Sequence, residues 1–149
     1  MTATPVQTTL EERVLDWTEQ LCNSLTENYK QYHLRSMKSM NAESGSEYTR
    51  KEIEATENGT ANLMKFVIKN GRKYYKIMQH DFDTFRDRNE YREGGVHAFV
   101  DKKTGEVYKP ASYNSPAKHV RYDMRIINQR EQLHNPFFTG WSGGYLYMR

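Results

Sequence analysis

An Asn-Gly pair at residues 70–71 predicts a tight reversal in the middle of this chain. It separates residues 62–69 from residues 72–78, two runs in which apolar and polar side chains alternate. Two-residue turns of this composition join antiparallel strands, because Asn and Gly tolerate the positive φ that a type I′ turn requires. The sequence therefore predicts a β-hairpin centred on Asn70 and Gly71.

A second hairpin is predicted from residues 96–101 and 106–109. Gly105 closes the connection between them and can supply a positive φ. Two successive hairpins indicate an antiparallel sheet. Further strand signals would bring it to five or six strands; they are a short edge strand at 51–57, a return at 119–123 and a turn feeding a last strand at 141–148.

Apolar and aromatic side chains recur at steps of three and four early in the chain, which places them on one stripe of an amphipathic helix. Thr9 and Glu12 have the spacing of a capping box at its start. The helix is predicted over residues 9–36, roughly 40 Å at 1.5 Å per residue. Its stripe packs most simply on the sheet, with a coiled-coil partner as the alternative. The stripe consists of Leu10, Val14, Trp17, Leu21, Leu25, Tyr29 and Tyr32.

The remaining segments complete a single α+β domain over residues 1–149. Residues 37–50 are rich in Ser, Asn and Glu and are predicted to form a linker, with the sheet region following over 51–149. Residues 79–95 carry three basic and five acidic side chains, so an exposed excursion between strands is expected there. A short helix is predicted at about 124–134. The expected fold is a long N-terminal helix packed on an antiparallel β-sheet.

Length and cysteine content restrict the class of protein. A chain of 149 residues suits one domain with one core. Residues 1–10 lack the pattern of a secretory signal or membrane anchor, and no apolar run approaches the ~20 residues that span a bilayer. Cys22 is the one cysteine, so an intramolecular disulfide and a cysteine zinc cluster are excluded. We therefore expect Cys22 to be a small helix residue in a reducing compartment.

The formal net charge of +3 is unevenly distributed. Residues 1–62 contain six Lys/Arg and ten Asp/Glu, whereas residues 63–149 contain sixteen and nine. Asymmetry of this kind favours an anionic partner for the second half.

The alternation in residues 72–78 puts Arg72, Tyr74 and Lys76 on one strand face. Cations interleaved with aromatic rings suit single-stranded nucleic acid, because phosphates need charge and bases need a ring to stack on. A solvated strand face carries the same residue types without any partner, and the sequence leaves both interpretations open. The predicted binding face also includes residues of the later strands, if these lie beside the first hairpin; they are Lys109, Lys118, His119, Arg121 and Tyr122.

Two histidines raise an enzymatic alternative. His97 and His119 could serve as base and acid in cleaving a phosphodiester, with Lys118 or Arg121 stabilising the developing charge. His97, however, lies in a Val-His-Ala-Phe-Val run that is typical of a partly buried strand. The sequence therefore favours a protein that is not an enzyme.

The segment that follows the first hairpin holds the one cluster of potential metal ligands, namely His80, Asp81, Asp83 and Asp87. It has neither EF-hand spacing nor a glycine bend, so a solvated acidic loop is favoured over a metal site. A phosphate-binding loop, a dinucleotide fingerprint and a nucleophile elbow are all missing from the sequence. We therefore expect no cofactor and no metal.

Three segments resemble a family of small uncharacterised proteins of tailed bacteriophages, notably phages of marine cyanobacteria. They are residues 96–112 (VHAFVDKKTGEVYKPAS), 116–122 (PAKHVRY) and 141–147 (WSGGYLY). The resemblance implies a phage origin and a location in the host cytoplasm, or alternatively in the virion. The family has no assigned activity, so the resemblance implies no catalytic residues.

Three functions follow as hypotheses. The preferred one is a non-enzymatic phage accessory protein that binds nucleic acid or an acidic host protein through its tyrosine-rich, basic sheet surface. The first alternative is a structural component of the virion that packs through its N-terminal helix. The second is a small metal-independent ribonuclease. The sequence does not fix the oligomeric state.

Overall fold

The computed structural model describes residues 8–147. The expectation that residues 1–10 hold no signal or anchor therefore falls mostly outside the described residues. Within residues 8–147, no helix combines the length and the apolar character needed to cross a membrane.

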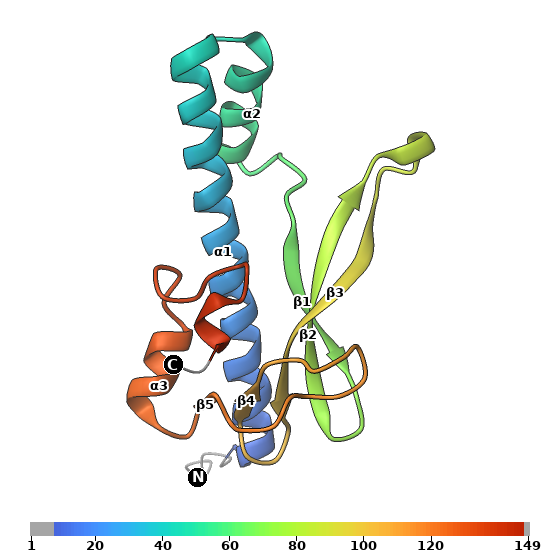
Figure 1. Cartoon of the computed structure of the whole chain (residues 1–149), viewed down its shortest axis with the longest axis vertical. Helices are drawn as coiled ribbons and strands as arrows, with labels where there is room; N and C mark the ends of the chain where they lie inside the picture. Colours follow the sequence, from blue (N-terminus) through green and yellow to red (C-terminus); the bar gives the residue numbers. More distant parts are fainter. Residues whose placement is uncertain (1–7, 148–149) are drawn as a thin grey trace, which may run out of the picture.

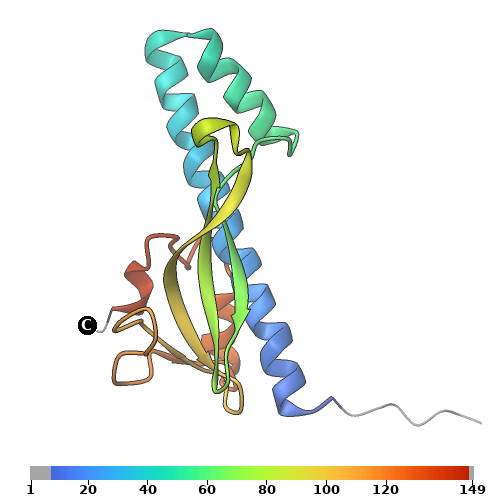
Figure 2. The same ribbon diagram turned by 90° about the vertical axis from the view of Figure 1, so that its right-hand side faces the viewer.

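The structure confirms the predicted α+β class. A five-stranded antiparallel sheet has its strands in chain order, β1-β2-β3-β4-β5, and the long helix α1 runs alongside it (Figures 1 and 2). The helices are α1 (Leu10–Ser44), α2 (Glu47–Glu57) and α3 (Ile127–Leu133), with 3₁₀ turns η1 (Phe85–Asp87) and η2 (Gly144–Leu146). The strands are β1 (Lys65–Asn70), β2 (Tyr74–Asp83), β3 (Glu90–Asp101), β4 (Glu106–Tyr108) and β5 (Tyr122–Asp123).

Helix α1 begins with the predicted capping box. The Glu12 amide donates to Thr9 Oγ1 over 3.2 Å, and the Thr9 amide donates to Glu12 Oε2 over 3.3 Å. These two bonds satisfy amides that a helix start leaves without partners. The helix continues to Ser44, two turns further than predicted, and Gly45 closes it with a φ of +58°.

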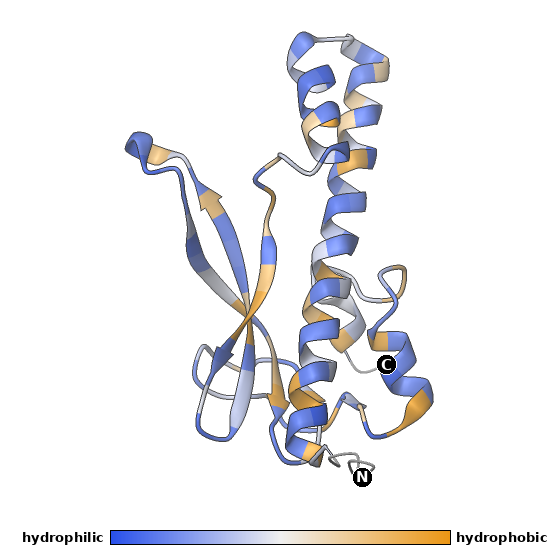
Figure 3. Cartoon of the chain, turned by 180° about the vertical axis from the view of Figure 1, so that it is seen from behind, coloured by the Kyte–Doolittle hydropathy of each residue, from blue (hydrophilic) through white to orange (hydrophobic). Residues whose placement is uncertain are grey.

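The predicted linker at 37–50 and the edge strand at 51–57 are both wrong. A second helix, α2, folds back along α1, with the Ser46 hydroxyl accepting from the Thr49 amide at its start. The Thr49 hydroxyl in turn donates to Asn41 Oδ1 over 3.0 Å. Ser and Asn are only mildly unfavourable in helices and Glu is a good helix former, so this tertiary contact outweighs the loop preference of Ser and Asn. The pair α1–α2 ends in a mainly hydrophilic tip (Figure 3).

The core lies between one face of α1 and the sheet. Val14, Leu21 and Leu25 are fully buried, and the sheet contributes residues that include Ile77 and Val100. Burying a Leu side chain contributes about 1.5–3 kcal/mol. The ends of the predicted stripe differ, since Leu10 and Tyr32 remain exposed.

Both predicted hairpins are present, but the first differs from its prediction in the turn. Asn70 pairs with Tyr75, so the turn lies at residues 71–74 and not at Asn70-Gly71. Neither Asn70 nor Gly71 has the positive φ of the predicted type I′ turn. In the second, Gly105 has a φ of +76°, and Asp101 Oδ1 accepts from the Lys103 and Thr104 amides. These side chain–backbone bonds fix the turn that joins β3 to β4.

Residues 79–95, predicted as an exposed excursion between strands, are mostly paired strand and not an irregular loop. They continue β2 and β3 as a paired arm, from His80 opposite Glu93 to Asp83 opposite Glu90, which ends in η1. The arm diverges from α1 (Figure 1). Because this part of the ladder stands beyond the core, charged side chains can occupy it at little desolvation cost.

The end of the chain corrects two predictions. The return at 119–123 shortens to the two-residue strand β5, whereas α3 lies within the predicted 124–134. The last strand predicted at 141–148 is wrong over its described part, because residues 144–146 form η2; Met148 lies outside the described residues. Gly143 turns the chain with a φ of +87°. Tyr145 and Leu146 both pack on the same core, whereas successive side chains of a strand point to opposite faces of the sheet.

We expect Leu21→Ala to lower the free energy of unfolding by about 2–5 kcal/mol, because it leaves a cavity between α1 and the sheet. Urea denaturation followed by circular dichroism measures this value. Leu15→Ala is the matched control on the outer side of the same helix, where the side chain is 37% exposed. Equal losses in the two variants would contradict the packing described.

Candidate functional site

Two adjoining hollows lie between the β4–β5 connection and the C-terminal segment 134–147. The first, the His97 hollow, has a volume of about 320 Å³, and the second, the aromatic hollow, about 690 Å³. They share Ser142 and Tyr147. The His97 hollow is lined chiefly by Gln79, His97, Lys109, Trp141, Ser142 and Tyr147. The aromatic hollow is lined chiefly by Arg121, Tyr122, Phe137, Phe138, Tyr145 and Tyr147.

Polar side chains of α1 hold one side of segment 134–147. Ser24 Oγ and Thr139 Oγ1 are 2.7 Å apart and both residues are buried. Asn28 bonds twice, donating to the Pro136 carbonyl over 2.7 Å and accepting from the Trp141 amide over 2.9 Å. Helix α1 therefore has two roles. Its apolar residues pack on the sheet, and its polar residues position the C-terminal segment 134–147.

The strands hold the other side of the segment. The Tyr122 hydroxyl donates to the Tyr145 carbonyl over 2.7 Å, and Arg121 Nε donates to the Leu146 carbonyl over 2.7 Å. The Tyr145 hydroxyl lies 2.8 Å from His97 Nε2. Anchored on both sides, the segment presents its remaining side chains from a fixed backbone.

Aromatic rings with large exposed fractions rim the aromatic hollow. Phe137 is 90% exposed, Tyr147 is 63% exposed and Phe138 is 37% exposed. Exposing several large apolar rings at one place is unfavourable in water and is typical of an interaction surface. The Lys109 Nζ lies 4.6 Å from the centroid of the Tyr147 ring, in cation–π contact.

The charged side chains among the described linings of both hollows are Lys109 and Arg121, and no Asp or Glu belongs to these linings. Arg121 Nη1 donates to the carbonyls of Lys118 and His119, at 2.9 and 2.7 Å. Carbonyl acceptors orient the guanidinium without neutralising its charge. The charged side chains that line the hollows are therefore both positive, which suits an anionic ligand, while the Asp81 carboxylate lies against Gln79 at the edge of the His97 hollow.

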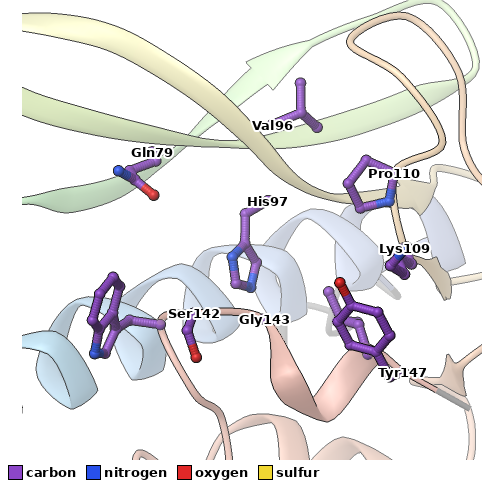
Figure 4. A pocket seen from close by; sticks show the side chains of 10 residues that line it. Gln79, Val96, His97, Lys109, Pro110, Ser142, Gly143 and Tyr147 are labelled. Carbon is purple, nitrogen blue, oxygen red and sulfur yellow. The ribbon is translucent and has the colours of Figure 1, made fainter.

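His97 lies at the base of its hollow, with its ring directed towards Ser142 and Gly143 (Figure 4). Burial lowers the pKa of His97 to about 4, so the imidazole is neutral at pH 7. Burial also raises the pKa of Tyr145 well above its usual value, so the hydroxyl bonded to His97 keeps its proton. A neutral pair is the form that a buried site favours.

The structure does not bring His97 and His119 to a common hollow. His119 is exposed, has a φ of +74° and is missing from the described linings of both hollows. A base with a pKa of about 4 is also weak at neutral pH. The catalytic pair therefore stays a prediction without geometric support.

The predicted binding residues form two groups on either side of β3, and the β4–β5 connection reaches over β3 to the first group. In the first group, Lys76 Nζ donates to the Tyr113 carbonyl over 2.8 Å and lies 4.3 Å from the centre of its ring. Tyr74 packs edge-on against Phe99, and Arg72 is exposed in the turn. The second group, on the β4–β5 connection and β5, consists of Lys109, Lys118, His119, Arg121 and Tyr122.

The acidic cluster of the arm has internal partners. Asp83 accepts from the Phe85 amide over 2.8 Å and pairs with Arg88 and Arg92; the Phe85 bond is the main cause of its lowered pKa. Within residues 8–147, no three His, Cys, Asp or Glu side chains are placed to hold a metal ion. Cys22 is buried, and its pKa is raised to about 12, chiefly by that burial.

Sequence reasoning missed Phe137, the most exposed ring at the site, and its neighbour Phe138. Their signal was an apolar pair directly after Asn135-Pro136, outside any helical or strand periodicity. It also missed Gln79 and Trp141, which reach the His97 hollow from β2 and from the C-terminal segment.

The buried neutral imidazole predicts a loss of stability in acid. In the unfolded chain His97 titrates near 6.5, whereas in the folded chain it titrates near 4, so the unfolded state binds the proton first as the pH falls. The neutral His97 therefore contributes fully to the free energy of unfolding above about pH 6.5. About 3 kcal/mol of this contribution is lost by pH 4.

Urea unfolding at pH 7, 6, 5 and 4 measures this loss. We expect His97→Gln, which cannot take up a proton, to lose about 3 kcal/mol less than the natural chain over that range. His119→Gln is the matched control at the exposed histidine and should follow the natural chain. Identical pH profiles for all three proteins would contradict the assignment.

No curated protein and no solved structure matches the chain. One family model matches residues 1–148, under the description "Family of unknown function (DUF7717)". The match extends over α1, the sheet and both hollows. On this match the chain belongs to DUF7717, a family of unknown function.

Proposed function

We propose that this chain is a non-enzymatic protein that binds single-stranded nucleic acid along the two adjoining hollows. The observation that carries the proposal is the position of Tyr147. Its ring is 63% exposed, belongs to both hollows and has the Lys109 ammonium 4.6 Å from its centroid. Ring and cation together offer a stacking surface for a base and a partner for the adjoining phosphate.

The physical chemistry favours a single strand over a duplex. Bases in a duplex are already stacked on one another, whereas unpaired bases gain about 1–3 kcal/mol each by stacking on a protein ring. Phe137, Phe138 and Tyr147 supply such rings around the aromatic hollow. Lys109 and Arg121 are the cations available to phosphates there.

The biological setting of the proposal is infection by a tailed bacteriophage, with binding in the host cytoplasm. Its support is the sequence resemblance of residues 96–112, 116–122 and 141–147 to phage proteins. Lys109, Arg121 and Tyr147 lie within these three segments, so the resemblance includes residues of the proposed binding surface.

Salt should weaken the binding. For single strands, the logarithm of the association constant falls by about 0.7 per phosphate contact for each tenfold rise in salt. Contacts from Lys109 and Arg121 alone give a slope of about −1.4, measured by fluorescence anisotropy with a labelled thymidine oligonucleotide.

We expect Lys109→Ala to reduce the slope by about 0.7. Lys103→Ala is the control, because Lys103 is exposed in the β3–β4 turn and does not line the hollows. If neither variant changed the salt dependence of the association constant, the phosphate contacts would lie elsewhere. If the natural protein did not bind the oligonucleotide at low salt, the proposal would be wrong.

Removing the rings should weaken binding at constant salt. We expect Tyr147→Ala and Phe137→Ala each to cost about 1–3 kcal/mol of binding free energy, because each loses a stacking surface. Tyr48→Ala is a closely matched control, since Tyr48 is 65% exposed but lies on α2. Equal affinity of all three variants for the oligonucleotide would show that these rings take no part.

A further inference from the structure

We infer that the His97 hollow is a pocket for one unpaired nucleobase, whose hydrogen-bonding edge is read by Gln79 and His97. The inference rests on the proposed binding of single-stranded nucleic acid and specifies what its first hollow recognises. It concerns a polar pocket, whereas the aromatic hollow offers mainly rings.

Two aromatic side chains belong to the lining of this hollow. Tyr147 is exposed at the rim that joins the two hollows. Trp141 is held by Tyr29 and Tyr32, whose ring centroids lie 5.3 and 5.1 Å from its own. The volume of about 320 Å³ corresponds to roughly ten water molecules of liquid. A flat heteroaromatic ring fits this space, and the lining offers it two surfaces for stacking.

Gln79 has a fixed orientation at the edge of the hollow. Its Nε2 lies 3.2 and 3.3 Å from the two carboxylate oxygens of Asp81 and donates to them. A carboxylate accepts only, so the amide nitrogen must face Asp81 and the Oε1 oxygen is left as an acceptor. Figure 4 shows the Gln79 side chain at the hollow together with His97 and Ser142.

His97 provides the complementary group. The Tyr145 hydroxyl, which retains its proton, has the imidazole Nε2 as its partner at 2.8 Å. An enclosed hydroxyl that donates to nothing is unfavourable, so Tyr145 donates to Nε2. In a neutral imidazole the hydrogen then resides on Nδ1, which becomes a donor.

The Nδ1 donor opens into the hollow. Among the described residues, no buried side-chain nitrogen or oxygen lacks a hydrogen-bond partner. The structure gives Nδ1 of His97 no partner within residues 8–147, so this atom cannot be one of the buried ones. His97 lines the hollow, and that is where its free nitrogen meets solvent.

The hollow thus combines an acceptor on Gln79, a donor on His97 and stacking surfaces on Trp141 and Tyr147. Nucleobases carry adjacent donors and acceptors on the edge that pairs in a duplex, and unpaired bases are recognised through this edge and by stacking. Lys109, at the same hollow, can pair with the flanking phosphate. In thymine, the N3–H would donate to Gln79 Oε1 and a neighbouring carbonyl would accept from His97 Nδ1.

The test compares a thymidine 12-mer with the same 12-mer made from N3-methylthymidine. Methylation removes the donor that Gln79 would accept from, while phosphates and stacking faces remain. We expect the natural protein to bind the methylated strand about tenfold more weakly, the effect of one lost base-edge contact. Fluorescence anisotropy at fixed salt gives both dissociation constants.

Variants at one position locate the discrimination. Gln79→Leu lacks the acceptor and should bind both strands equally. Tyr48→Ala, on α2, should discriminate as the natural protein does. Equal binding of the two strands by the natural protein overturns the base pocket but leaves salt-dependent binding intact. No binding of either strand at low salt overturns the proposed function as well.

Discussion

The contact between the buried stripe of α1 and the sheet supports every other part of this molecule. Val14, Leu21 and Leu25 are excluded from water by the strands, and hydrophobic burial is the main favourable contribution to folding. The polar residues beside that stripe then take a second role. Because Ser24 and Asn28 are held in place with the helix, they can fix the C-terminal segment through hydrogen bonds.

The site combines an anchored backbone with exposed rings. The hydrogen bond between His97 and Tyr145 joins β3 to the C-terminal segment, and it joins two neutral groups, which avoids the cost of burying a charge. Phe137 and Tyr147 extend from this segment into solvent. Anchoring a surface before it meets a ligand reduces the entropy lost on binding, so the arrangement favours recognition.

Local sequence signals predicted the parts of the fold that local interactions determine. Asn70-Gly71 and Gly105 marked the two hairpins, but for different reasons. Gly105 has the positive φ that its turn needs, whereas neither Asn70 nor Gly71 has a positive φ, and Gly71 instead leaves room for the nearby Tyr74 carbonyl. The helical pair could not be predicted from residues 37–57, since the contact of Thr49 with α1 outweighs a composition typical of loops. The conformation of residues 141–147 could not be predicted locally either. A 3₁₀ turn forms there in place of the expected strand, because Gly143 turns the chain and Tyr145 and Leu146 pack on the core.

The candidate site was largely hidden in the sequence for a different reason. Gln79, His97, Lys109 and Trp141 come from four separate parts of the chain, and only the sheet order and the folded C-terminal segment bring them to one hollow. Three of the expected binding residues, Lys109, Arg121 and Tyr122, do line the hollows. Tyr74 and Lys76 share a strand face, as alternation predicted, and both contact Phe99. Arg72 lies in the turn before β2, and none of the three lines the hollows.

The arm formed by the outer halves of β2 and β3 has a consequence for how this protein fluctuates. Its paired backbone, from His80 to Asp83 and from Glu90 to Glu93, extends beyond the core that α1 covers. Hydrogen bonds without a packed layer over them open without the rest of the molecule unfolding. We therefore expect the arm to open as a separate unit from η1 inwards, and the amides opposite α1 to exchange with solvent only when the whole domain opens.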